Sequence, residues 1–159
     1  MKPIKQLKKD ARAFSKRWTG KGDEREDYRN FWLDLTENVF GLENVLRNAE
    51  VDKVVQTIRG QWKHIDFYMY PPVSIIAVQK DPFVEDLDAV YFNQALIYVG
   101  CLVTHLMPRY VILCNFKKFQ IYDRAVDTYS PQATFPLDEL AKNIQCLEFI
   151  AQQEPYCYK

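Results

Sequence analysis

The stretch Asp66–Tyr98, DFYMYPPVSIIAVQKDPFVEDLDAVYFNQALIY, decides the fold that we predict for this chain. An acid in a β-prone segment comes first, followed by an apolar strand that ends in Gln79-Lys80. A segment with helical spacing then carries Gln94 and Tyr98, which lie one turn apart on one face. Side chains alternate along a strand, so position 78 shares a face with Lys80, whereas positions 77 and 79 do not.

This order of residues is typical of a metal-dependent nuclease core. Hydrolysis of a phosphodiester needs charge neutralisation at the phosphate and an activated water, and Mg²⁺ bound by carboxylates supplies both. Asp66 is the candidate metal ligand, and Lys80 would stand near the attacked phosphate. The second carboxylate is expected two residues before the lysine, where the chain has Val78. The sequence therefore predicts a nuclease-like site with a weakened metal centre.

Other acids could return the missing ligand. Alternation points Asp81 to the face opposite Lys80, so it would help only if the strand ends there. The remaining candidates lie beyond Pro82 or in the second predicted helix: Glu85, Asp86, Asp34 and Glu37. The competing interpretation is that Lys80 is a solvated strand end and that Gln94 and Tyr98 form an ordinary helical pair.

Bulk composition fits one globular domain over residues 1–159, with residues 1–21 forming a basic helix that leads into the core. No apolar run of 18 residues and no signal-peptide pattern is present, so we expect a cytoplasmic protein without a membrane partner. The cysteines are then expected to be reduced thiols: Cys101, Cys114, Cys146 and Cys157. With two histidines and no Cys-x-x-Cys, a structural zinc site is not expected.

Charge is unevenly distributed, although the net charge is zero. Residues 1–21 contain eight basic residues and one acid, a net charge of +7, and the rest of the chain carries −7. Lys5, Lys9, Arg12 and Lys16 recur at helical spacing and are the candidate DNA-binding residues. The alternative is that this row is a solvated helix face without a partner.

Periodicity and turn residues predict the order α, α, β, β, β, α, β, β, α. This order implies an α/β chain of the α+β type, in which helices cover a mixed sheet. The expected helices span 3–17, 24–40, 87–106 and 137–152. The expected strands span 51–58, 62–70, 73–80, 110–114 and 119–123.

Longer segments resemble the N-terminal nuclease domain of MmeI-like restriction-modification enzymes, over roughly residues 10–152. The matching segments, in order, are FSKRW at 14–18, FWLDL at 31–35, VFG at 39–41, ID at 65–66, QK at 79–80, RYVILCNF at 109–116, FQIYD at 119–123 and FPLDEL at 135–140. The resemblance implies a PD-(D/E)xK, restriction-endonuclease-like core with helices on both faces, and Mg²⁺-dependent cleavage of double-stranded DNA.

By this resemblance Asp66 is a metal ligand and Lys80 the catalytic lysine. Gln94 and Tyr98 match a Gln-x-x-x-Tyr motif that supports the site and the DNA backbone. The family glutamate has no counterpart, because Val78 stands in its place. Full-length relatives add a methyltransferase and a target-recognition domain, and no S-adenosylmethionine site is expected in this chain.

Three functions remain open at this stage. The first is the endonuclease domain of a combined restriction enzyme and DNA methyltransferase, with weak or lost cleavage. The second is a catalytically inactive module that docks DNA or sister domains through the basic helix. The third is a structural role without nucleic acid, which the negative charge of the remaining chain keeps open.

Overall fold

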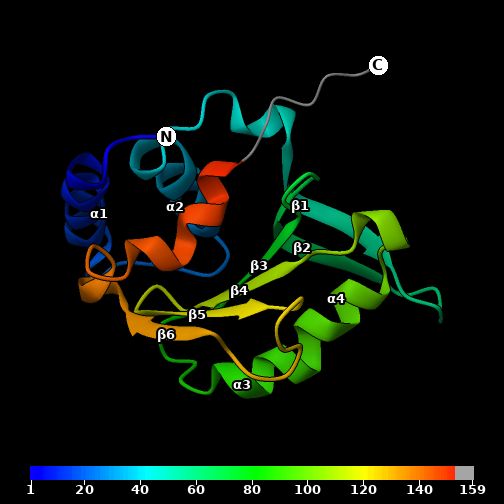
Figure 1. Cartoon of the computed structure of the whole chain (residues 1–159). Coiled ribbons are helices and arrows are strands. Elements are labelled where there is room, and N and C mark those ends of the chain that lie inside the picture. Colours follow the sequence, from blue (N-terminus) through cyan, green and yellow to red (C-terminus); the bar gives the residue numbers. More distant parts are fainter. Residues whose placement is uncertain (153–159) are drawn as a thin grey trace.

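The computed structural model describes residues 1–152 and contains a mixed sheet with helices on both faces (Figure 1). Within the described residues the sheet has six strands, whose spatial order follows the chain from β1 to β6. The strands are β1 (Ala49–Gln56), β2 (Trp62–Met69), β3 (Ile75–Gln79), β4 (Tyr110–Cys114), β5 (Lys118–Asp123) and β6 (Ala133–Pro136). The predicted sheet and its two helical layers are confirmed.

The pair β3–β4 is parallel, whereas the other neighbouring strands pair antiparallel. A parallel pair needs a long crossover, and residues 80–109 supply it on one face of the sheet. The register sets Gln79 opposite Cys114, and the backbone N–H of Lys80 donates to the carbonyl of Cys114 at 2.8 Å. Lys80 therefore leaves the sheet at the shared carboxyl edge of two central strands.

One face of the sheet is covered by the N-terminal helices and by the C-terminal part of the described chain (Figure 1). These elements are α1 (Ile4–Trp18), α2 (Tyr28–Leu33), the π-helical η1 (Asp34–Val39), and the 3₁₀ segments η5 (Leu137–Glu139) and η6 (Ile144–Gln152). Helix α1 turns Leu7, Ala11 and Phe14 fully inward, because residues three or four positions apart share one face of a helix. Aromatic rings fill much of this layer, with Phe31 in contact with Phe14, Trp32 and Phe119.

The crossover covers the opposite face. Its elements are α3 (Leu87–Val90), the π-helical η3 (Tyr91–Ala95), α4 (Leu96–Gly100) and the 3₁₀ turn η4 (Thr104–Leu106). Their apolar side chains pack on Ile76, Val78 and Leu113 of the two parallel strands. A further 3₁₀ turn, η2 (Val45–Arg47), leads into β1. Position 78 is thus part of an apolar core.

Several predicted boundaries were wrong. The helix expected over 24–40 begins at Tyr28, because residues 23–27 form a turn, and the one expected over 87–106 ends at Gly100. The helix expected over 137–152 is two 3₁₀ segments with i to i+3 bonds, such as Leu140 N–H to the Leu137 carbonyl. Strand β6 was not predicted. Strands β1 and β3 shift or shorten by up to two residues relative to 51–58 and 73–80.

Free thiols occur at Cys101, Cys114 and Cys146, whereas Cys157 lies outside the described residues. Over residues 1–152, none of the helices has the length and apolarity needed to cross a bilayer.

The bond between Trp32 and Gln79 gives a test of the fold. Trp32 Nε1–H donates to Gln79 Oε1 at 3.0 Å, and both side chains are fully or almost fully buried. Trp32→Phe leaves that oxygen unpaired, so we expect a loss of about 1–3 kcal/mol in the free energy of unfolding. Urea denaturation measures it. Trp62→Phe is the control, because Trp62 is 66% exposed, and we expect a change within about 0.5 kcal/mol. Equal effects of the two substitutions would contradict this account.

Candidate functional site

Asp66 holds the end of β3 with its side chain. The last residue pair between β2 and β3 is Phe67 with Ala77, and the same register would next place Val78 opposite Asp66. Asp66 Oδ2 accepts a hydrogen bond at 2.7 Å from the backbone N–H of Gln79. A carboxylate thus replaces a backbone carbonyl where the two strands stop pairing.

Burial raises the pKa of Asp66 to about 6. The Gln79 N–H bond and the positive charge of Lys80 oppose this rise, whereas the negative charges of Glu24 and Asp52 add to it. Raised carboxyl pKa values are found where acids are gathered at functional sites, and also in structural charge clusters. Asp66 is therefore a partly desolvated acid close to one cation and two other acids.

Lys80 turns into the same site. Its Nζ donates to Glu24 Oε1 at 3.2 Å, and the Lys80 side chain is 14% exposed. Glu24 comes from the turn that precedes α2, on a different element from Asp66 and Lys80. The positive charge of Lys80 acts on Asp66, so the two side chains lie near each other in the folded chain, and Glu24 is a neighbour that sequence reasoning missed.

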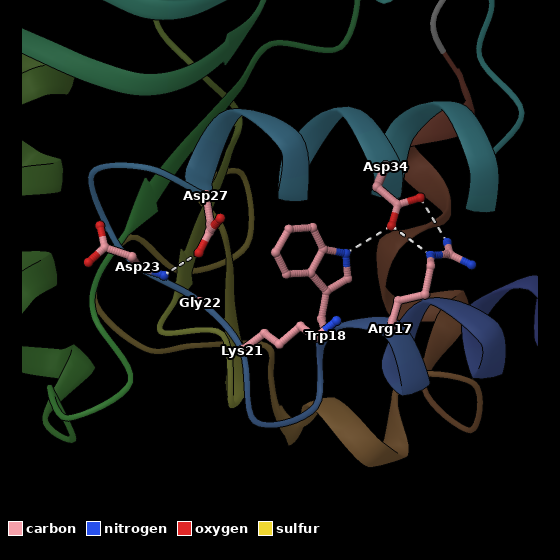
Figure 2. Close-up of a pocket in the computed structure, with 7 residues that line it drawn as sticks. All are labelled: Arg17, Trp18, Lys21, Gly22, Asp23, Asp27 and Asp34. Carbon is pink, nitrogen blue, oxygen red and sulfur yellow. Dashed lines mark hydrogen bonds and ion pairs between the residues drawn. The ribbon is translucent and has the colours of Figure 1, made fainter.

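The turn that carries Glu24 is held by carboxylates. Asp23 Oδ1 accepts from the N–H groups of Arg25 and Glu26, and the Asp23 N–H donates to Asp27 Oδ2 at 2.8 Å (Figure 2). The Glu24 N–H donates to Asp81 Oδ1 at 2.8 Å. The only sequence signal for this turn is the acid-rich run after Gly22, most of which falls within the helix expected over 24–40.

Gly22 fixes the approach to this turn. Its φ is +126°, and an added Cβ would lie 2.2 Å from the ring of Phe116. The residue forms part of a pocket with Trp18, Lys21, Asp23 and Asp27, which also extends to the Arg17–Asp34 ion pair (Figure 2). Close packing of the backbone on Phe116 leaves the turn little freedom to move Glu24 away from Lys80.

The crossover contributes Tyr98. Burial raises the pKa of its hydroxyl, and the charges of Asp66 and Glu24 raise it further, so Tyr98 lies near both acids. Gln94 lies in the π-helical η3, where it is partly buried, and no hydrogen bond or ion pair joins it to the others in the described chain. The structure thus places Tyr98 near the two acids of the predicted centre. Val78 is fully buried in the apolar core beneath the crossover.

The proposed replacement acids lie elsewhere, with one exception. Asp81 reaches the site indirectly, because it binds the backbone of Glu24. Asp34 accepts from Arg17 and Trp18, and Asp86 caps α3 through the N–H of Ala89. Glu37 and Glu85 are exposed.

The basic row of α1 is solvent-exposed, as its spacing predicts: Lys5, Lys9, Arg12 and Lys16. No ion pair with an acid engages these four side chains in residues 1–152. Lys2 and Arg17, by contrast, pair with Asp10 and Asp34. Helix α1 and helix α4, which carries Tyr98, lie in the layers on opposite faces of the sheet (Figure 1).

The carboxylate oxygens of Asp66 and Glu24 are the type of ligand that a hard cation such as Mg²⁺ prefers. No group of three or more His, Cys, Asp or Glu side chains placed to hold a metal exists in residues 1–152. Mg²⁺, however, keeps several waters and is commonly held by one or two carboxylates together with substrate phosphates. Asp66 and Glu24 meet that smaller requirement, and Val78 cannot contribute a ligand.

The sequence profile of the family described as "MmeI, N-terminal domain" matches residues 9–158. The chain therefore belongs to this family, as the resemblance predicted. No curated protein matches the chain.

Among solved structures, the cryo-EM structure of a DrdV–DNA complex is similar, with a TM-score of 0.62 at 15% sequence identity. The match covers 96% of this chain and 14% of the DrdV chain. The restriction-endonuclease-like fold class is thereby confirmed, and this chain spans about one seventh of the length of that protein.

The raised pKa of Asp66 gives a test in metal-free buffer. Between an unfolded pKa near 3.8 and a folded pKa of about 6, the folded state binds more protons, so stability falls as pH rises. Asp66→Asn removes this penalty and keeps an acceptor for the Gln79 N–H. We expect the variant to be more stable than the parent at pH 7–8, by about 1–3 kcal/mol.

Denaturant unfolding at pH 7.5 and pH 4 in the presence of EDTA measures this difference. The gain should shrink towards pH 4, where the parent side chain is largely protonated in the folded state. The assignment would be contradicted if the stability of Asp66→Asn relative to the parent were lower at pH 7.5 than at pH 4.

Proposed function

We propose that this member of the MmeI N-terminal domain family is the endonuclease domain of a combined restriction enzyme and DNA methyltransferase. It would hydrolyse phosphodiester bonds of double-stranded DNA through a PD-(D/E)xK type of site that uses Mg²⁺. The observation that carries the proposal is the convergence of Asp66 and Lys80 where β2 and β3 stop pairing. Its partners would be DNA and the methyltransferase and target-recognition domains of a longer protein.

The roles of the side chains follow from their chemistry. A bound Mg²⁺ would neutralise phosphate charge and supply an activated water. Asp66, fixed by the Gln79 N–H, would offer its remaining oxygen to the metal. The Lys80 ammonium would stabilise negative charge that grows on the phosphate during attack. The Tyr98 hydroxyl, close to both acids, would orient the water or a phosphate oxygen through a hydrogen bond.

Position 78 limits the expected rate. Val78 is fully buried and apolar, so β3 supplies no carboxylate beside Lys80. Loss of one electrostatic stabiliser typically costs about 10²- to 10³-fold in rate. We therefore propose a nuclease whose intrinsic cleavage is weak, and not one that has lost the chemistry altogether.

Nicking of supercoiled plasmid tests this proposal. With Mg²⁺ or Mn²⁺ we expect slow nicking by the parent chain, none by Lys80→Ala, and faster nicking by Val78→Glu. The gain should reach up to about 10²-fold, if the new carboxylate restores one stabiliser. Val78→Gln is the matched control, since glutamine has nearly the same shape as glutamate but lacks its charge. Nicking that survives Lys80→Ala, or that Val78→Gln enhances equally, would refute the assignment.

The basic row of α1 favours a second candidate function, a module that docks DNA. Four exposed cationic side chains, none of which forms an ion pair within residues 1–152, make up a row to which a phosphate backbone could bind. Such contacts give affinity without reading sequence. This function is compatible with the first, because docking and cleavage would use different faces.

The salt dependence of duplex binding tests the basic row. We expect Lys5→Gln/Lys9→Gln to lower the slope of log K against log salt by about 2, because each phosphate contact contributes about 0.9. Lys117→Gln/Lys142→Gln is the control, since both residues are exposed and lie outside α1. Fluorescence anisotropy at several salt concentrations gives the slopes. Equal slopes for the two double variants would show that α1 has no specific part in binding.

A further inference from the structure

We infer that Glu24 supplies the second metal-binding carboxylate of this site, in the place that Val78 leaves without a ligand. The inference rests on the proposed function, because it assumes that Asp66 and Lys80 form a nuclease centre. It goes further by moving a ligand from the strand β3 to the turn before α2.

The first argument is convergence in space. Glu24 Oε1 lies 3.2 Å from Lys80 Nζ, and the charge of Glu24 acts on both Asp66 and Tyr98. The ion pair joins Glu24 to Lys80, and Asp66 and Tyr98 lie close enough for the charge of Glu24 to act on them. A cation that binds beside Lys80 would therefore have oxygen ligands from both Asp66 and Glu24.

The second argument is that the backbone of Glu24 is fixed on both sides. Four consecutive N–H groups, those of residues 23–26, are each bound by a carboxylate. The bond to Glu24 comes from Asp81, which directly follows Lys80, so the turn is tied to the end of β3. Gly22 packs on Phe116 just before it. The side chain of Glu24 is consequently directed at Lys80 by tertiary contacts.

The third argument concerns charge. Two carboxylates around one ammonium leave a net negative charge, and Glu24 and Lys80 are 31% and 14% exposed. A simple ion pair would need only one acid. The additional carboxylate suits a divalent cation, which would bind Asp66 and Glu24 while Lys80 turns to a phosphate.

Asp52 on β1 is a competing acid. Its charge also acts on Asp66, but its Oδ1 lies 2.9 Å from His64 Nδ1 and its side chain is 53% exposed. Asp81 binds the backbone N–H of Glu24 and thereby supports the turn that carries it. Glu24 is therefore the acid whose position and partners fit a ligand best.

Mn²⁺ binding, read from the electron paramagnetic resonance signal of the free ion, tests the assignment without relying on cleavage. We expect Glu24→Gln and Asp66→Asn each to weaken Mn²⁺ binding by at least the roughly 10- to 100-fold that loss of an outer-shell partner costs. Glu26→Gln removes the same charge from an exposed residue of the same turn and should leave binding unchanged. Asp52→Asn should have a much smaller effect than Glu24→Gln.

The double variant Glu24→Gln/Val78→Glu completes the test. If the two positions serve one ligand role, a carboxylate at 78 should restore the binding that Glu24→Gln removes. Thermal unfolding in EDTA checks that each variant is folded.

The outcomes separate the inference from the proposed function. If Asp66→Asn abolishes binding and Glu24→Gln leaves it intact, the assignment of Glu24 is overturned and the nuclease proposal stands. Equal losses in Glu24→Gln and Asp52→Asn also overturn it, since they would reflect general electrostatics. If the parent chain binds no Mn²⁺ up to millimolar concentrations, or if Asp66→Asn binds normally, both proposals fail.

Discussion

At the end of β3 the carboxylate of Asp66, and not a backbone carbonyl, accepts the hydrogen bond of the Gln79 N–H, and the site depends on this bond. Pairing between β2 and β3 ends at Phe67 and Ala77, and Asp66 Oδ2 then takes the N–H of Gln79. The two strands can separate beyond this point without leaving that amide unpaired. The separation gives the side chains of Lys80, Tyr98 and Glu24 a common place to meet.

Gln79 connects the site to the aromatic layer on the other face. Its N–H faces Asp66, while its side chain accepts from Trp32 of α2. The Gln79 side chain thus binds the α2 layer, whereas the neighbouring Val78 packs beneath the crossover on the opposite face, because side chains alternate along the strand. A second link, from Asp81 to the Glu24 backbone, joins the turn before α2 to the same strand end, and the Glu24–Lys80 ion pair adds a third. Helix α2 and the turn before it are therefore both held to the end of β3.

Sequence reasoning could predict whatever depends on local pattern. The spacing of the basic row predicted the exposed face of α1, because that face follows from regular helical geometry. Glu24 could not be found in this way. Its role depends on Asp81, Lys80 and Gly22, which approach it only in the folded chain, and the acidic run around it is equally typical of the first turn of a helix. The short edge strand β6 and the 3₁₀ segments lack a periodicity long enough to recognise.

A metal ion is sensitive to where oxygen atoms lie, and not to which element carries them. Position 78 can therefore become apolar if another element brings a carboxylate to the same place. Two consequences follow for this chain. Val78 adds to the packing beneath the crossover helices, where a charge would need a partner. Glu24 stands on a turn and not on a strand, so its side chain reaches the centre only because hydrogen bonds hold the turn in place. The dense hydrogen bonding of residues 23–27 is then a requirement of the site, because a ligand carried by a turn is only as well placed as the turn itself.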